Sequence, residues 1–151
     1  MKKMAVVCLG IILLSSLVYA EGGAVKQYQK IIEPNPNDAE AYYNIGVVYY
    51  NEKKYDDSKA QFQKAIEIYP DFSEAYYSLG AVYYAEANYD KAIETFSKAI
   101  QIDPRDYGAI YQLGVVYNIK KDKAQAVAQV DKLKALSRNE LARKLEKLIN
   151  K

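Results

Sequence analysis

The sequence contains no histidine and no tryptophan, and its single cysteine is Cys8. Without histidine, the chain has no side chain that ordinarily exchanges a proton near neutral pH and no imidazole ligand for a metal ion. No glycine-rich loop of the kind that holds phosphate is present. Adjacent carboxylates such as Asp56 and Asp57 are interpreted as the first turn of a helix, where negative charge is favourable. These absences predict a protein that is not an enzyme and has neither metal nor other cofactor.

The first twenty residues have the pattern of a secretory signal peptide. Lys2 and Lys3 precede an apolar run over residues 4–18, and Ala20 ends a short exit sequence. We expect cleavage after Ala20 and a periplasmic or secreted protein. The alternative is an uncleaved anchor in the inner membrane, although the run is shorter than the ~20 residues of a spanning helix. Cleavage would remove Cys8 and leave a chain without a thiol.

Charge is distributed unevenly along the chain. After loss of the two N-terminal lysines the net charge is 0, which gives no reason to expect a nucleic-acid partner. However, residues 21–118 carry a net charge of −6 and residues 119–151 carry +6. Such a split is informative about partners. It is compatible with head-to-tail pairing of molecules, with docking of the basic tail on a membrane surface, or with a solvated surface that has neither role.

A ten-residue stretch recurs three times at a fixed spacing. Residues 41–50 return at 75–84 and, less closely, at 109–118. The step of 34 residues is kept by three glycines and three prolines, Gly46, Gly80, Gly114, Pro36, Pro70 and Pro104. A period of this length is typical of stacked supersecondary units. The chain is therefore expected to form a stack and not a single compact core.

Each unit is expected to be a helix, a turn and a second helix. In the first unit Asn37 and Asp38 are both good N-caps, apolar residues after them fall on one helical face, and a second helix over residues 56–68 ends before Pro70. Glycine in the first helix should let the two helices approach closely. Bulky residues of the second helix, Phe62 and Phe96, should fill the gaps.

This pattern resembles the tetratricopeptide repeat. The first copy has Tyr42, Ile45, Gly46, Tyr49, Ser58, Phe62 and Pro70, and the second has Tyr76, Leu79, Gly80, Tyr83, Ala92, Phe96 and Pro104. The third has Ile110, Leu113, Gly114, Tyr117, Ala126 and Val130, with Arg138 in place of proline. The resemblance implies an all-α fold, an α-solenoid of stacked antiparallel helix pairs, and a protein-binding function.

The expected organisation has six segments: a signal peptide (1–20), an N-terminal half-repeat helix (24–36), three repeats (39–72, 73–106 and a degenerate 107–140), and a C-terminal capping helix (137–151). Three turn residues, Lys53, Ala87 and Lys121, stand where the family commonly has glycine. If they need a left-handed backbone, each costs roughly 1 kcal/mol, and the hairpin turns are then expected to be adjusted. A capping box over 137–140 is expected to open the last helix. That helix should bury Leu141, Leu145, Leu148 and Ile149.

The tyrosines of the first helices divide into two faces. By resemblance, one face of each first helix lines a concave groove. The other face, with Tyr42, Tyr49, Tyr76, Tyr83 and Tyr117, is assigned to internal packing. The predicted groove residues are Glu40, Tyr43, Val47, Tyr50, Glu74, Tyr77, Ala81, Tyr84, Tyr111, Val115 and Asn118. Gly108 shares this face.

Tyrosine offers a large apolar area and a polar tip, so the groove is expected to bind a protein or peptide segment with apolar side chains. Val47, Ala81 and Val115 stand where asparagines would be needed to grip a C-terminal carboxylate, so that mode is not expected. The main hypothesis is a non-catalytic adaptor of the cell envelope. One alternative is a self-associating structural protein of the envelope. Another is that the groove tyrosines only pack adjacent first helices together.

Overall fold

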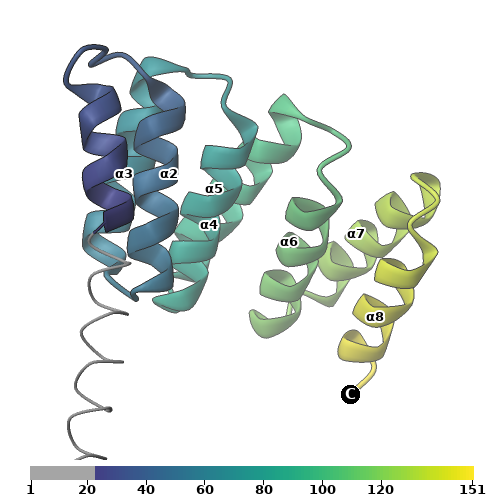
Figure 1. The fold of residues 1–151 in the computed structure, drawn as a ribbon. Coiled ribbons are helices and arrows are strands. Elements are labelled where there is room, and N and C mark those ends of the chain that lie inside the picture. Colours follow the sequence, from purple (N-terminus) through teal and green to yellow (C-terminus); the bar gives the residue numbers. More distant parts are fainter. Residues whose placement is uncertain (1–22) are drawn as a thin grey trace, which may run out of the picture.

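The computed structural model describes residues 23–151, in which every regular element is an α-helix (Figure 1). The predicted signal peptide lies outside these residues. None of the described helices is long and apolar enough to cross a membrane. A first helix covers residues 23–32. It is followed by α2 (Ala39–Asn51), α3 (Tyr55–Ile68), α4 (Ser73–Ala85), α5 (Tyr89–Ile102), α6 (Tyr107–Ile119), α7 (Lys123–Ala135) and α8 (Asn139–Ile149).

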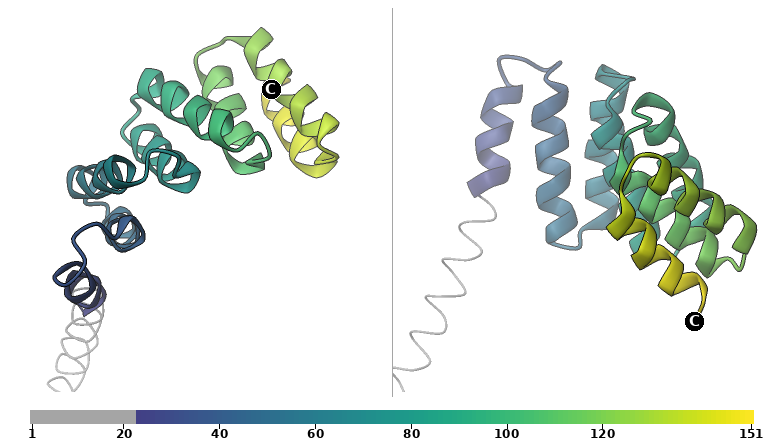
Figure 2. Two further views of the ribbon diagram at one scale, coloured as in Figure 1. Left: turned by 90° about the horizontal axis from the view of Figure 1, so that it is seen from above. Right: turned by 90° about the vertical axis from the view of Figure 1, so that its right-hand side faces the viewer.

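The helices form antiparallel pairs that stack in chain order. The pairs are α2 with α3, α4 with α5, and α6 with α7, and α8 packs against α7 and α6. Neighbouring pairs meet where α3 contacts α4 and where α5 contacts α6. The stack bends into an arc (Figure 2, left). The expected α-solenoid is confirmed.

Each first helix ends in the same backbone motif. The amide of Lys54 donates to the Tyr49 carbonyl at 2.9 Å, and that of Lys53 donates to the Tyr50 carbonyl at 2.9 Å. This pair of hydrogen bonds is a Schellman motif, in which the residue after the helix C-cap takes a left-handed backbone conformation. Lys53 is this residue, with a φ of 60°. The equivalent residues are Ala87 (57°) and Lys121 (64°), so all three turns keep the left-handed conformation without glycine.

The prediction that residues 137–140 form a capping box at the start of α8 is wrong. Ser137 has a φ of 58° and its amide donates to the Lys134 carbonyl, while the amide of Arg138 donates to the Leu133 carbonyl, both at 2.8 Å. Ser137 thus ends α7 with the same motif as the other turns. Arg138 occupies the N-cap position before Asn139 and makes no side-chain cap. The helices α7 and α8 therefore form a fourth tight hairpin.

Glycine sets the distance between the paired helices. A Cβ on Gly46 would lie 2.7 Å from the ring of Phe62, and one on Gly80 would lie 2.8 Å from the ring of Phe96. Both rings are fully buried. Ser58 stands where the family has alanine, and its buried hydroxyl donates to the Gly46 carbonyl at 2.8 Å. The expected glycine contact is confirmed in the first two pairs.

The third pair is completed by the last helix. Val130 stands where the other pairs have phenylalanine. The space beside Gly114 is filled by Leu145 of α8, whose side chain a Cβ on Gly114 would overlap. Leu145 and Ala142 are fully buried, whereas Leu148, expected to face inward, is 36% exposed. The capping helix thus supplies the side chain that Val130 is too small to provide.

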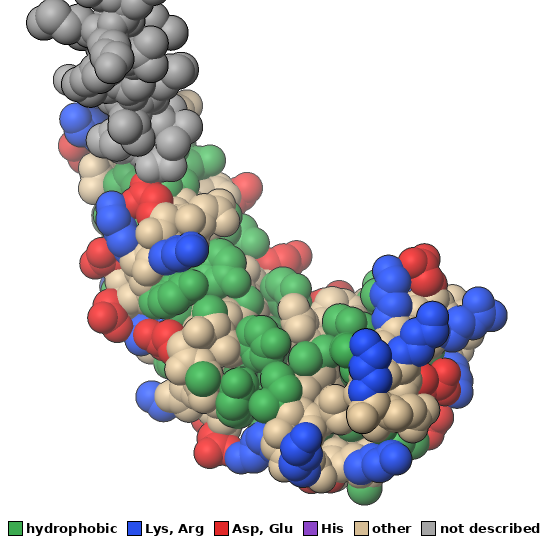
Figure 3. Space-filling model, turned by 90° about the horizontal axis from the view of Figure 1, so that it is seen from below, with side chains coloured by type: hydrophobic (Ala, Val, Ile, Leu, Met, Phe, Trp, Pro, Cys, Tyr) green, Lys and Arg blue, Asp and Glu red, His purple; other side chains and the backbone are tan. Residues whose placement is uncertain are grey.

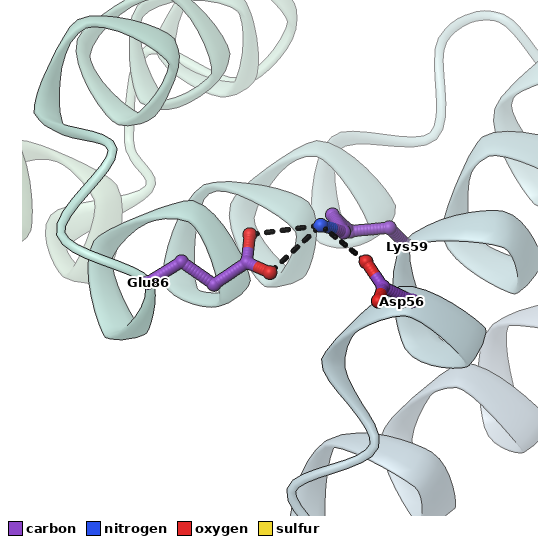
Figure 4. Close-up of polar contacts among 3 residues, drawn as sticks. All are labelled: Asp56, Lys59 and Glu86. Atoms are coloured by element: carbon purple, nitrogen blue, oxygen red, sulfur yellow. Dashed lines mark hydrogen bonds and ion pairs between the residues drawn. The ribbon is translucent and has the colours of Figure 1, made fainter.

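Ion pairs link neighbouring pairs at their outer edges. Lys59 of α3 contacts both carboxylate oxygens of Glu86, at 2.7 and 2.9 Å, and Asp56 at 2.9 Å (Figure 4). Hydrogen bonds to Glu86 and Asp56 raise the pKa of Lys59. At the next junction Asp90 of α5 pairs with Lys120 at the end of α6. Because such pairs near the surface contribute at most about 1 kcal/mol, apolar contact dominates the stacking.

The N-terminal helix ends before its predicted boundary. It stops at residue 32 and not at residue 36. Pro34 explains the difference, because proline disfavours helical backbone at the preceding residue. Val25 packs inward with 9% exposure, while Ile31 is 42% exposed. One apolar position of this helix is therefore uncovered, as expected for a helix without its own partner.

Replacing Gly80 by alanine should lower the free energy of unfolding by about 1–3 kcal/mol, because the new methyl group overlaps Phe96. In a helix without this contact, the same change would raise stability by ~1 kcal/mol. Urea unfolding followed by circular dichroism shows whether the substitution lowers or raises the free energy of unfolding. In a Phe96→Leu background the loss should shrink. An equal loss in both backgrounds would contradict the proposed contact.

Replacing Leu145 by alanine should lower the free energy of unfolding by about 2–5 kcal/mol, because removing a fully buried side chain leaves a cavity beside Gly114. Leu148→Ala on the same helix is the matched control and should cost less than ~1 kcal/mol, since Leu148 is partly exposed. Thermal unfolding of both variants makes the comparison. Similar losses would show that α8 is not held through Leu145.

Candidate binding groove

The first helices of the pairs lie on the inside of the arc. Within residues 23–151, α2 contacts α4, α4 contacts α6 and α6 contacts α8, whereas α3 makes no contact with α5. Elements on the inside of a bend are drawn together and those on the outside are spread apart. The first helices therefore line the concave side, as Figure 2 (left) shows.

The structure brings the predicted groove residues to this concave side with different exposures. Glu40 and Glu74, at the start of α2 and α4, are exposed. The other nine residues are half-buried: Tyr43, Val47, Tyr50, Tyr77, Ala81, Tyr84, Tyr111, Val115 and Asn118. The tyrosines and the two valines among them also pack against the core clusters of the stack.

The groove tyrosines take part in pairing as well as facing the groove. The ring of Tyr43 lies 5.7 Å from that of Phe62, and the ring of Tyr77 lies 5.8 Å from that of Phe96. These are the same phenylalanines that pack under Gly46 and Gly80. The expectation that Tyr43 and Tyr77 point away from the paired helix is therefore wrong. Each ring contacts the buried phenylalanine of its own pair and remains half-buried.

The same tyrosines bridge adjacent first helices. The Ser78 hydroxyl donates to the Tyr43 hydroxyl oxygen at 3.5 Å, which is a long contact. A Cβ on Gly108 would lie 3.3 Å from the ring of Tyr77, so this ring reaches the first turn of α6. Packing between first helices is therefore real. It covers part of each ring, and both tyrosines stay half-buried.

Further aromatic pairs lie near the hairpin turns. Tyr50 lies 5.9 Å from Tyr55, and Tyr84 lies 6.2 Å from Tyr89, measured between ring centroids. Burial, with smaller contributions from Tyr55 and Tyr77, raises the pKa of Tyr50, so its hydroxyl keeps its proton to a higher pH than an exposed tyrosine. Figure 3 shows apolar side chains gathered on the face seen from below.

The tyrosines assigned to internal packing are less buried than expected. Tyr83 is 9% exposed, but Tyr42, Tyr49 and Tyr76 are only half-buried. Tyr42 and Tyr49 line a cavity of about 370 Å³ beside the N-terminal helix. Tyr76 and Tyr83 border an open groove of about 730 Å³ between α4 and α5. The two faces therefore differ less in burial than the sequence pattern indicates.

Two hollows at the junctions between repeats were missed by sequence reasoning. The first, about 550 Å³, is bordered by Tyr69 and Phe72 from the loop between α3 and α4. The second, about 320 Å³, is bordered by Asp103 and Asp106, which stand 34 residues later. Two aromatic residues beside Pro70 in a turn are the signal that could have pointed to the first hollow.

Both hollows are acidic at the groove side. Glu40 and Glu74 border the first, and Glu74 also borders the second. Asp106 caps α6 by accepting a hydrogen bond from the Ala109 amide at 2.8 Å. Burial, with a smaller contribution from Asp103 and Glu74, raises the pKa of Asp106. In the described chain, no group of three carboxylates is arranged to hold a metal ion.

A stack of helical hairpins with a 34-residue period and glycine-set pairing defines a repeat scaffold. The tetratricopeptide repeat model matches residues 39–72 and 73–106, and a second TPR repeat model matches residues 22–53. The chain belongs to the tetratricopeptide repeat family. Members of this family are generally non-catalytic adaptors that bind other proteins. The matches end at residue 106, before the repeat in which Val130 and Arg138 replace phenylalanine and proline.

Solved structures of low sequence identity share the fold. MamA protein superposes with a TM-score of 0.71 at 22% identity, covering 99% of this chain and 86% of that chain. The Arabidopsis OM64 TPR domain superposes with a TM-score of 0.68 at 19% identity, covering 74% of this chain and 93% of that chain. The MamA RS-1 ArsTM double mutant superposes with a TM-score of 0.71 at 26% identity, covering 83% of this chain and 70% of that chain. A search of curated protein sequences gives no significant match.

Proposed function

We propose that this protein is a non-catalytic adaptor of the cell envelope that binds a protein segment along the inner faces of α2, α4 and α6. The observation that carries the proposal is the row formed by Tyr43, Tyr77 and Tyr111, half-buried on three successive inner helices. A half-buried tyrosine held by packing loses little further rotamer entropy when a ligand covers it. The family's general role in protein binding supports the class of function.

The chemistry of the inner face favours an extended or helical segment with apolar side chains. Val47, Ala81 and Val115 lie between the tyrosines and offer no hydrogen bonds from their side chains. Backbone groups of an α-helix are already paired within the helix, so recognition here depends on side-chain contact and not on strand addition. The proposed location in the envelope rests on the signal-peptide pattern of residues 1–20.

Blocking the groove requires a position that does not open the core. Serine at Tyr43 or Tyr77 would leave space beside Phe62 or Phe96 and lower stability as well as binding. Ala81 is half-buried on the inner face of α4, and a long charged side chain there can extend into the groove. Ala60 is exposed on α3, one of the outer helices, and provides the same substitution elsewhere.

We expect Ala81→Arg to reduce recovery of bound partner by about tenfold, which corresponds to ~1.4 kcal/mol of binding free energy. Ala60→Arg should leave recovery unchanged. The tagged full-length protein is purified from its native host, and co-purified proteins are quantified by mass spectrometry. Circular dichroism confirms that both variants are folded. Equal recovery with the two variants would contradict binding in the groove.

Self-association is a second candidate function, favoured by the charge distribution. Residues 21–118 carry a net charge of −6 and residues 119–151 carry +6. Lys and Arg side chains crowd the C-terminal arm in Figure 3. Two molecules placed head to tail would bring opposite charges together. Such pairing would extend the stack instead of closing it.

Head-to-tail pairing predicts larger species at low salt that dissociate at high salt, because the screening length falls from about 10 Å at 0.1 M to about 3 Å at 1 M. Sedimentation velocity of the chain without residues 1–20, over a range of concentrations, makes the measurement. A monomer at every concentration and salt level would rule out self-association. That result would leave the groove proposal intact.

A further inference from the structure

A hollow bordered by aromatic rings lies where α2 and α4 begin. Its volume is about 550 Å³. The rings of Tyr43 and Phe72 are 5.1 Å apart, and those of Phe72 and Tyr69 are 5.7 Å apart, with tilts of 40° in both pairs. The three rings thus form a continuous wall that runs from the half-buried Tyr43 to the surface.

The outer end of this wall is open to solvent. Tyr69 is 53% exposed, the highest value among the exposed large apolar side chains of the described residues. Tyr69 follows the last residue of α3 and belongs to the loop between the first two repeats. Packing of the stack accounts for Phe72 and Tyr43 but not for an exposed ring at this position.

Negative charge surrounds the aromatic wall. Glu40 and Glu74 border the hollow, both are exposed, and no lysine or arginine borders it. Among residues 23–151, neither of these carboxylates forms an ion pair. The negative potential of the two carboxylates is therefore not compensated by a neighbouring cation of the chain.

Aromatic faces and carboxylates attract the same kind of ligand. The face of an aromatic ring carries partial negative charge and attracts ammonium and guanidinium groups. Unpaired carboxylates attract the same groups and repel anions. We propose that the hollow bordered by Tyr43, Tyr69, Phe72, Glu40 and Glu74 binds a lysine or arginine side chain of the protein partner. The proposal rests on the proposed function, because the hollow lies at the edge of the groove. It predicts that the bound partner segment carries a positively charged side chain.

The second junction provides an internal comparison. There Asp103 and Asp106 stand in place of Tyr69 and Phe72, and Arg105 borders the hollow. Asp103 accepts a hydrogen bond from the Arg105 amide at 2.9 Å, so this loop is organised by its own backbone. The second hollow is also bordered by Tyr43, Tyr77 and Tyr107, but its loop contributes no aromatic ring and Arg105 places a positive charge at its border. The ring of Tyr107 is already covered by the guanidinium of Arg138. Of these two hollows, the first combines linked aromatic rings and carboxylates with no neighbouring cation, so the cationic side chain is assigned to that junction.

The test uses N-acetyl-arginine amide as the probe and residues 21–151 as the protein. Backbone amide chemical shifts are followed by NMR during titration at low salt. We expect saturable shifts centred on residues 69–74. N-acetyl-leucine amide, which has no charge, should produce no saturable shift there. The same shifts with both probes would overturn the proposal.

Two variants remove the two attractions separately without opening the core. Tyr69→Leu keeps an apolar side chain but removes the ring, and Glu74→Gln removes a charge. Each should weaken binding of the arginine probe by about two- to fivefold, the range expected for a cation–π contact or an exposed ion pair. The matched control for the charge is Glu94→Gln on α5, an exposed position that should bind as the unchanged chain does. Unchanged binding in both test variants would refute the site.

The outcomes separate this proposal from the proposed function. If Ala81→Arg abolishes partner recovery while Tyr69→Leu and Glu74→Gln do not reduce it, the groove stands and the cationic contact is refuted. If the arginine probe binds as expected but Ala81→Arg leaves partner recovery unchanged, the groove fails and the cation-binding hollow stands. Reduced recovery with all three variants supports both.

Discussion

The close approach of two paired helices over a glycine is the contact on which the architecture depends. At Gly46 and Gly80 any Cβ would strike the buried ring of the paired phenylalanine. The separation within each pair, and with it the repeat geometry, is therefore set by the absence of one side chain. Gly114 shows that the rule concerns space and not residue type, because Leu145 of the capping helix fills the gap that Val130 leaves.

The same contact prepares the inner face for binding. With Phe62 and Phe96 buried beneath the glycines, Tyr43 and Tyr77 pack against those rings and stay half-buried on the inner helices. The tyrosines are thus held in place before any partner arrives. Where the repeats meet, the first loop adds Tyr69 to this aromatic surface. In the proposed function, the residues that pack the stack and those that would meet a partner are therefore the same tyrosines.

Sequence periodicity was sufficient to predict the fold, because glycine, proline and apolar residues recur at one spacing and each has a single structural use. The left-handed turns at Lys53, Ala87 and Lys121 were predictable from their alignment with a common glycine. Ser137 was not, since its local pattern also fits a capping box, and only tertiary packing decides that it ends α7. Loop residues such as Tyr69 lie outside helical periodicity, so their clustering with groove residues needed the structure.

The central claim is that recognition occurs on the inner helices and not on the outer ones. Site-specific photo-crosslinking in the native host tests it most directly, with the crosslinking amino acid placed at position 81 on α4 or at position 60 on α3. The account predicts that position 81 captures a defined protein partner and that position 60 does not. Capture from position 60 alone, or equally from both positions, would contradict it.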